Sequence, residues 1–239
     1  MKKQQLQAQF QSPGKKLAIL IDPDHSDELR LIKLCREAVK YKVDFFLIGG
    51  SLLVNGKVSS TLAILKKNSN IPLLLFPGNS MQINSKADAI LLLSLISGRN
   101  AELLIGQHVQ AAPLLKKSKL EIIPTGYILI DGGKPTSVSY ISNTLPIPNN
   151  KPAIAACTAL AGEQLGLQCI YLEAGSGAEI PVSAELITAV KKEISVPLIV
   201  GGGIRTNKQA NDAWNAGADI IVIGSAVEKN MQLLKELAR

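Results

Sequence analysis

Aromatic residues are scarce in this 239-residue chain, where Phe, Trp and Tyr together make up 4%. That is little for a protein that stacks nucleic-acid bases on aromatic side chains. Histidine occurs twice, and the three cysteines (Cys35, Cys157 and Cys169) lack metal-type spacing. A Cys/His zinc site is therefore not expected. Cys35 and Cys169 lie in helical and strand patterns, where we expect them to be small buried hydrophobic residues.

Long apolar runs are also missing. No stretch approaches the ~18 residues of a membrane-spanning helix, and residues 1–10 lack the apolar segment and cleavage site of a signal peptide. With an odd number of cysteines, this favours a cytoplasmic protein. The hydrophobic content of 46% excludes intrinsic disorder. The charge of +7, from 26 Lys and Arg against 19 Asp and Glu, is typical of proteins that meet nucleic acid, an anionic membrane or a phosphorylated substrate.

Eight apolar runs of strand length alternate with helical patterns. They cover residues 16–22, 45–49, 71–77, 87–94, 121–130, 169–175, 196–202 and 218–224. The helices expected between and after them cover 26–41 (with Ser26 as N-cap), 57–67, 100–117, 152–165, 183–193, 207–216 and the C-terminal end. Continuous apolar strands are typical of parallel sheets buried on both faces. The pattern predicts one (β/α)8 TIM barrel over residues 1–239, with a polar N-terminal extension at 1–15.

Two connections are irregular. Only residues 77–86 join the third and fourth strands, which is too short for a packed helix with two loops. This shortened third unit is either a harmless abridgement or a groove for an elongated apolar ligand. The long, turn-rich loop at 131–150 follows the fifth strand, and long loops in compact domains are usually functional.

Glycine clusters follow the seventh and eighth strands, at 201–206 and 224–226. Each cluster leads into a predicted helix, so glycine backbone and helix N-terminal amides would meet there, an arrangement that favours an anion. A single cluster would be read more simply as a tight turn. Two clusters at these strand ends favour the usual phosphate site of a barrel.

The sixth strand ends in the sequence YLEAGSG at 171–177. Glu173 places a carboxylate at the barrel mouth, where it could accept a proton from a hydroxyl or orient it. The alternative for Glu173 is a salt bridge to Arg205. Tyr171 could donate a hydrogen bond to a phosphate, or pack in the core with its hydroxyl satisfied locally.

The first and second strands end in Asp22 and Ser51. A carboxylate and a hydroxyl at neighbouring strand ends are oxygen ligands of the kind that Mg²⁺ takes, with substrate phosphates completing the shell. The alternative for Asp22 is an N-cap or turn residue before Pro23. Asp24 and His25 are read as loop residues, and His108, within a helical pattern, as structural.

The chain resembles the geranylgeranylglyceryl phosphate synthase family, the PcrB-like prenyltransferase barrels. The matching pieces are IDPD, IGGS, YLEAGSG, GGGIR and VIGSA at the ends of strands one, two, six, seven and eight. The segment GKPTSVSYISNTLPIP resembles the family branch that has a long loop there. The similarity extends from about residue 17 to residue 230.

The resemblance implies a transferase of phospholipid biosynthesis. It joins the C3 hydroxyl of sn-glycerol 1-phosphate to a polyprenyl diphosphate, usually geranylgeranyl diphosphate, and releases diphosphate. Asp22 and Ser51 would bind the Mg²⁺ that holds the prenyl diphosphate, and Glu173 would be the catalytic residue. The residues implied to contact sn-glycerol 1-phosphate are Tyr171, Leu172, Glu173, Ala174, Gly175, Ser176, Gly177, Gly202, Gly203, Gly224 and Ser225.

Two positions depart from the family pattern. Another branch has a lysine two residues before the first-strand aspartate, where this chain has Leu20. That lysine helps to bind glycerol phosphate, so its role is absent or filled otherwise, with Arg205 as one candidate. Ser225 stands where the family often has Asn, and its backbone N–H and hydroxyl make the change tolerable.

Other functions remain open from the residues alone. A sugar-phosphate isomerase or lyase would use the same phosphate cup, but would not explain the pairing of Asp22 with Ser51. A non-catalytic phosphometabolite sensor, or a barrel that only binds anionic membrane, belongs to a different class. The family resemblance also implies a homo-oligomer, a dimer or larger ring, and allows peripheral membrane contact. No nucleic acid is expected.

Overall fold

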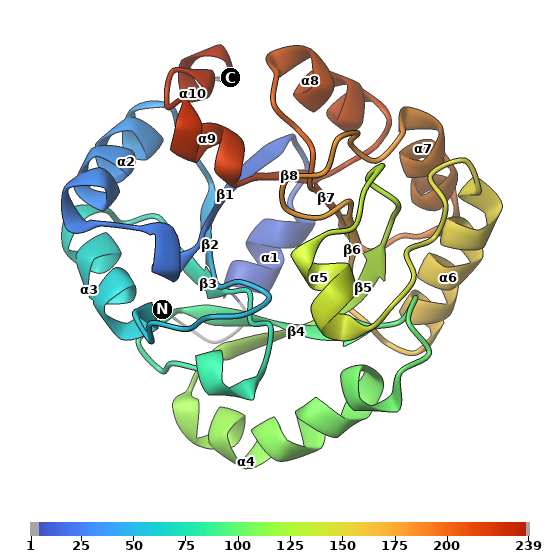
Figure 1. Ribbon diagram of the computed structural model, residues 1–239, viewed down its shortest axis with the longest axis horizontal. Helices are drawn as coiled ribbons and strands as arrows, with labels where there is room; N and C mark the ends of the chain where they lie inside the picture. Colours follow the sequence, from blue (N-terminus) through green and yellow to red (C-terminus); the bar gives the residue numbers. More distant parts are fainter. Residues whose placement is uncertain (1–4, 238–239) are drawn as a thin grey trace.

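Eight parallel strands close into a barrel in sequence order, as the apolar runs predict. The computed structural model describes residues 5–237, and Figure 1 shows the strands surrounded by a ring of helices. The (β/α)8 TIM barrel is therefore confirmed. The strands are β1 (Lys16–Ile21), β2 (Phe45–Ile48), β3 (Leu73–Leu75), β4 (Ala89–Leu95), β5 (Glu121–Leu129), β6 (Cys169–Glu173), β7 (Leu198–Gly201) and β8 (Ile220–Ile223).

The helices follow the predicted ranges with small shifts at their ends. The predicted N-cap Ser26 is wrong by one residue, because the Asp27 carboxylate accepts the Arg30 N–H at 2.9 Å while the Ser26 hydroxyl donates to the Asp22 carbonyl. The predicted helix at 100–117 divides into a π-helix, η3 (Glu102–Gly106), and α4. The main helices are α2 (Glu28–Lys40), α3 (Val58–Asn68), α4 (Gln107–Ser118), α6 (Pro152–Gln164), α7 (Ala184–Glu193), α8 (Asn207–Asn215), α9 (Ser225–Lys229) and α10 (Leu233–Glu236).

Successive residues of each strand face opposite sides of the barrel wall. On β6, Cys169 and Tyr171 pack inside the barrel, whereas Ile170 and Leu172 pack in the outer layer beneath the helices. Both Cys169 and Cys35 are buried, as expected, and Cys157 is exposed. This alternation decides which residues of a strand can reach a ligand at the barrel mouth.

The third unit is shortened, as predicted. Between β3 and β4 the described chain forms only a single 3-10 turn, η2 (Ser80–Gln82). The Gln82 side chain donates to the Gly50 carbonyl at 2.8 Å, which ties this segment to the end of β2. The barrel flank beside β3 and β4 is therefore covered by a thin segment instead of a helix.

The long loop at 131–150 is more ordered than a turn-rich segment suggests. It contains α5 (Ser137–Ser142), whose N-terminus has a capping box formed by Thr136 and Ser139. Ile130 and Ile147 also form a short parallel bridge, which closes the base of the loop. In Figure 1, α5 lies near the strand ends at the mouth of the barrel.

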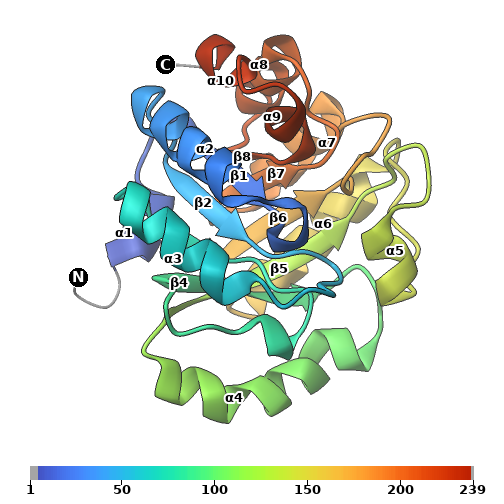
Figure 2. The ribbon, with the colours of Figure 1, turned by 60° about the vertical axis from the view of Figure 1, so that its left-hand side comes forward.

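The N-terminal segment is not simply a polar extension. Residues 5–11 form helix α1 (Gln5–Gln11), and its side chains Leu6 and Phe10 are buried. Phe10 packs on Phe45 with ring centroids 4.8 Å apart, and the Glu121 carboxylate accepts the Leu6 and Gln7 amides at 3.1 and 2.7 Å. Figure 2 shows α1 at the end of the barrel opposite α5, so this helix closes the barrel floor. Residues 1–4 of the predicted extension lie outside the described residues.

Candidate active site

A cavity of about 970 Å³ opens at the carboxyl ends of the strands, where barrel active sites are built. It brings together predicted residues from five strand ends that are far apart in the sequence. Those that line it are Asp22, Ser51, Tyr171, Glu173, Gly175, Ser176, Gly177, Gly202, Gly203, Gly224 and Ser225. Leu172 and Ala174 do not line it, because their side chains pack in the outer layer.

Glu173, at the end of β6, is only 5% exposed. Its carboxylate accepts the Gly175 N–H at 2.7 Å. Burial raises the pKa of Glu173 to about 7, opposed by the Gly175 amide and by the nearby Tyr171 and Tyr127 hydroxyls, which lower this pKa. A carboxyl group with a pKa near neutrality is suited to general base catalysis, since both of its protonation states are populated.

Three aromatic rings lie beneath this carboxylate. Phe76 stacks on Tyr171 with centroids 5.1 Å apart, and Tyr127 meets both rings edge-on at 5.8 and 5.4 Å. The Tyr171 hydroxyl is buried beside the Glu173 carboxylate, with which it interacts, and no other partner for it occurs among the described residues, so it can also meet a ligand in the cavity. These three rings thus lie together where the inner barrel meets the cavity, whereas Phe10 and Phe45 pack at the barrel floor.

Tyr127 was missed in the sequence analysis. It is almost fully buried, and burial followed by the nearby Glu173 charge raises the pKa of its own hydroxyl well above the usual value. The register pairs Tyr127 of β5 directly with Tyr171 of β6, so both side chains face the barrel interior. This pairing is the signal that could have identified it, but it requires the strand register to be known.

The glycines after β7 keep the space in front of Glu173 open. A Cβ on Gly202 would lie 2.6 Å from both the Glu173 Oε1 and the Gly175 nitrogen. Gly202 and Gly203 also have positive φ values of 84° and 72°, which side chains rarely adopt. Within residues 5–237, the amides of these two glycines donate to no intramolecular acceptor. Glycine amides left free in this way are the donors of backbone anion-binding sites.

The N-terminus of α8 does not line this cavity, whose lining after β7 ends at Arg205. Thr206 and Gln209 form a capping box at the start of α8, and the Gln209 side chain accepts the Arg205 and Thr206 amides. After β7, the loop glycines are therefore closer to a ligand in the cavity than the helix N-terminus, although the sequence predicted a role for both.

Asp22 and Ser51 lie on adjacent strand ends and line the same cavity. The Asp22 carboxylate accepts the Asp24 amide at 2.9 Å and the His25 Nδ1 at 3.0 Å. Asp22 is thus also the turn residue of the alternative reading, since it caps the short 3-10 turn η1 (Pro23–His25). No cluster of three or more His, Cys, Asp or Glu side chains suited to a metal occurs among residues 5–237. A carboxylate and a hydroxyl fit Mg²⁺ only where a ligand's phosphate oxygens complete its shell.

Asp24 fixes the neighbouring loop. Its carboxylate accepts the Val54 and Asn55 amides, which joins the loop after β1 to the loop that begins with Ser51. Asp24 is a loop residue, as expected, and it holds the two candidate metal ligands in register.

The alternative salt bridge between Glu173 and Arg205 is absent from the described residues. The Arg205 guanidinium instead donates to the carbonyls of Gly177, Ala178 and Glu179, in the loop after β6. Arg205 lines the cavity, and so does Leu20. At the first-strand position where another family branch has lysine, this chain therefore presents an apolar side chain to the cavity.

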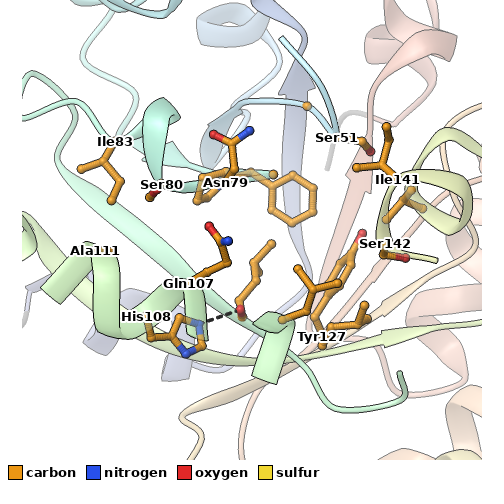
Figure 3. A pocket seen from close by; sticks show the side chains of 18 residues that line it. Ser51, Asn79, Ser80, Ile83, Gln107, His108, Ala111, Tyr127, Ile141 and Ser142 are labelled. Carbon is orange, nitrogen blue, oxygen red and sulfur yellow. Dashed lines mark hydrogen bonds between the residues drawn. The ribbon is translucent and has the colours of Figure 1, made fainter. Parts of the chain in front are cut away.

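A second cavity adjoins the first and is lined by residues of β4, of α4 and α5, and of the segment after β3 (Figure 3). The two share Ser51, Phe76, Tyr127, Val138 and Ile141. Within it, the His108 Nε2 donates to the Leu93 carbonyl at 2.8 Å, which agrees with a structural histidine. We call this cavity the apolar groove; its apolar lining is Phe76, Pro77, Ile83, Leu93, Leu95, Leu103, Ala111, Val138 and Ile141.

The fold and site define a (β/α)8-barrel enzyme with a buried carboxylate in a glycine-lined cavity that adjoins an apolar groove. The chain belongs to the PcrB family, whose sequence profile matches residues 13–239. A geranylgeranylglyceryl phosphate synthase from Spirosoma linguale is 57% identical over 227 residues, covering 95% of this chain and 91% of that protein. One from Thermococcus gammatolerans is 44% identical and covers 88% of this chain and 83% of that protein.

Solved structures give the same result. The (S)-3-O-geranylgeranylglyceryl phosphate synthase from Thermoplasma acidophilum, in complex with its substrate sn-glycerol-1-phosphate, has a TM-score of 0.92 at 32% identity. The alignment covers 100% of this chain and 97% of the Thermoplasma acidophilum chain. The chain is therefore an enzyme, a transferase of the prenyltransferase type. Among the described residues, no helix is long and apolar enough to cross a membrane.

Proposed function

We propose that the protein transfers a polyprenyl group, of twenty carbons if it follows its family's usual donor, from its diphosphate to the C3 hydroxyl of sn-glycerol 1-phosphate. The observation on which this rests is the position of Glu173, a buried carboxyl with a pKa of about 7 that lines the glycine-lined cavity beside Tyr127, whose ring borders both this cavity and the apolar groove. A base at this place can meet a polar acceptor in the cavity near the end of an apolar donor chain.

The glycerol phosphate would occupy the glycine-lined cavity. The backbone amides of Gly202 and Gly203 and the buried Tyr171 hydroxyl would supply donors for its phosphate. Amide dipoles bind a dianion without titrating near neutral pH. The bound acceptor would then direct its free C3 hydroxyl toward Glu173.

The prenyl diphosphate would bind with its charged head near Asp22 and Ser51 and its chain in the apolar groove. Asp22 and Ser51 would hold Mg²⁺, which when bound neutralises the charge of the diphosphate leaving group. Ser51 lines both cavities. One prenyl diphosphate molecule could therefore have its head in the first cavity and its chain in the apolar groove. The missing third helix leaves the side of the barrel available for the chain.

In the reaction, Glu173 accepts the proton of the C3 hydroxyl as the oxygen forms a bond to the allylic C1. The bond between C1 and the diphosphate oxygen breaks, and diphosphate leaves with the electron pair. The Tyr127 ring borders both cavities, where it faces the carbon that gains positive charge. Aromatic faces attract cations by about 0.5–2 kcal/mol. The product is a prenylglyceryl phosphate ether.

The test supplies radiolabelled sn-glycerol 1-phosphate, Mg²⁺ and prenyl diphosphates of increasing length, and measures label extracted into butanol. We expect extractable label with at least one prenyl donor and none without a donor. The Glu173→Gln variant should bind glycerol phosphate with nearly unchanged affinity and turn over ~10²–10⁴-fold more slowly. No extractable label with any donor would refute the proposed reaction, and unchanged turnover of Glu173→Gln would refute the role of Glu173.

A further inference from the structure

The mouth of the barrel is bordered on one side by three segments that follow β2, β3 and β5. They comprise residues 51–58, 77–86 and 132–151, and we call them the rim. The rim surrounds the entrance of the apolar groove, because each of its segments contributes residues to the groove lining. In Figures 1 and 2, α5 of the third segment lies at the mouth, away from the floor helix α1.

Large apolar side chains project from all three rim segments into solvent. Val54 is 78% exposed, Met81 is 86% exposed and Leu145 is 90% exposed. Tyr140, which lines the cavity mouth, is also largely exposed. Single exposed apolar residues are ordinary on a protein surface, but a group of them around one opening is typical of an interaction site.

The charge of the rim has a single sign. Its three segments contain Lys57, Lys86, Lys134 and Lys151 and no Asp or Glu. The Lys86 Nζ donates to Ser59 in the first turn of α3, which brings its charge toward the mouth. Carboxylates beside the rim are bound to its backbone: Asp24 accepts the Val54 and Asn55 amides, and Asp131, directly before the third segment, accepts the Gly133 N–H at 2.9 Å.

Other acidic residues of the mouth lie on the opposite side. Asp22, Asp27, Glu179 and Glu228 follow β1, β6 and β8. The mouth is thus divided into an acidic sector and a sector of exposed apolar and basic residues. The second sector includes the groove entrance.

We propose that the rim docks on the surface of an anionic lipid bilayer, with its apolar side chains inserted among the lipids and its lysines against the headgroups. Apolar tips bordered by lysines are the composition of peripheral membrane-binding surfaces. An apolar groove that opens at this surface could receive a long-chain lipid without passing it through water. The reason for docking rests on the proposed function, whereas the binding itself is measurable without any reaction.

The experiment is flotation of the whole protein with vesicles, in the absence of Mg²⁺ and of both substrates. Vesicles of phosphatidylcholine alone are compared with vesicles that contain about one-third phosphatidylglycerol. We expect binding to the anionic vesicles that weakens as salt is added, because salt screens the lysine charges. The readout does not depend on prenyl transfer, so a failed transfer assay would leave this result interpretable.

Two pairs of variants locate the surface. Met81→Ser with Leu145→Ser should reduce the vesicle partition coefficient by about tenfold or more, because two apolar side chains no longer insert. Its control is Leu165→Ser, which changes a 79% exposed leucine after α6, at the opposite end of the barrel. The double variant Lys134→Gln, Lys151→Gln should reduce binding to anionic vesicles by about tenfold or more. Its control is the double variant Lys116→Gln, Lys117→Gln at the end of α4, which should bind nearly as well as the wild type.

Several outcomes would overturn the proposal. These are absence of binding to anionic vesicles at low salt, or equal losses in the rim and control variants. Light scattering on the Met81→Ser, Leu145→Ser protein supplies a further check. A change in its molar mass relative to wild type would make the rim an interface between copies of this chain, and docking on lipid would be rejected.

Discussion

Gly202 and Glu173 lie so close that a single methyl group on the glycine would collide with the Glu173 carboxylate, the proposed base. The added Cβ would be 2.6 Å from the Glu173 Oε1. It would also lie 2.6 Å from the nitrogen of Gly175, whose N–H bonds to the same carboxylate. The absence of a side chain at Gly202 therefore preserves both the position of the base and the space in front of it.

Gly202→Ala should lower kcat/KM for glycerol phosphate by ~10²-fold or more, because displacement of a catalytic group by about 1 Å costs that much. The measurement is steady-state kinetics together with the affinity for glycerol phosphate. Gly166→Ala is the matched control, since Gly166 has φ of 88° against 84° for Gly202 but nothing within 4 Å of its Cβ. Equal losses in the two variants would assign the effect to backbone strain instead of the collision.

Glu173 should also reduce the stability of the protein at neutral and alkaline pH. Its pKa is about 7 in the folded chain, against an ordinary value of 4.5. The folded state therefore holds this proton more tightly than the unfolded state. Its stabilising contribution is complete below about pH 4.5 and is lost as pH rises to about 7, a difference of about 3 kcal/mol.

Glu173→Gln removes this ionisation and should raise the free energy of unfolding at about pH 8 by about 2–3 kcal/mol more than at about pH 5. Urea denaturation at the two pH values measures the difference. The exposed Glu179 supplies the control, and Glu179→Gln should change stability by less than about 0.5 kcal/mol at either pH. A gain from Glu173→Gln that does not depend on pH would contradict the raised pKa.

Continuous apolar runs were sufficient to predict the barrel, since parallel strands buried on both faces leave that pattern in any sequence. The strand ends then located Asp22, Ser51, Tyr171 and Glu173, which line one cavity. A contiguous sequence motif does not show which of its residues face the ligand. Leu172 belongs to the same motif as Tyr171, yet it faces the helices because side chains alternate along β6.

Other features depended on tertiary contacts. Tyr127 reaches the site only because β5 and β6 pair it with Tyr171, and a sequence does not specify that register by itself. Helix α1 looked polar because it buries only Leu6 and Phe10, and their burial depends on the open floor of the barrel. The apolar content of a seven-residue helix is too small to identify it in isolation.

Tyr127→Phe should shift the pH dependence of the reaction while preserving the aromatic ring. The Tyr127 hydroxyl lowers the pKa of Glu173, so its removal should raise that pKa further. The acid limb of the kcat/KM profile should move to higher pH, with a loss of activity that is larger at about pH 6 than at about pH 8.5. Tyr41→Phe, at the C-terminus of α2 and away from the cavity, is the control. A uniform loss at all pH values would assign Tyr127 to packing alone.

Asp22→Asn should separate binding of the diphosphate head from binding of glycerol phosphate. The amide keeps an oxygen for the Asp24 N–H but lacks the charge that would attract Mg²⁺. The Mg²⁺ concentration needed for half-maximal rate should rise by about tenfold or more, which corresponds to about 1.4 kcal/mol. The KM for glycerol phosphate should stay nearly constant, because its proposed donors lie on β6 and on the loop after β7.

The control for this prediction is Asp27→Asn, in the same loop. Asp27 caps α2 through its side chain, and asparagine is an equally good N-cap. Its Mg²⁺ requirement and stability should therefore match those of the wild type. Chelation of Mg²⁺ should abolish activity in all three proteins, and readdition should restore it. If Asp22→Asn needed no more Mg²⁺ than Asp27→Asn, the Asp22 carboxylate would act only as the cap of its turn.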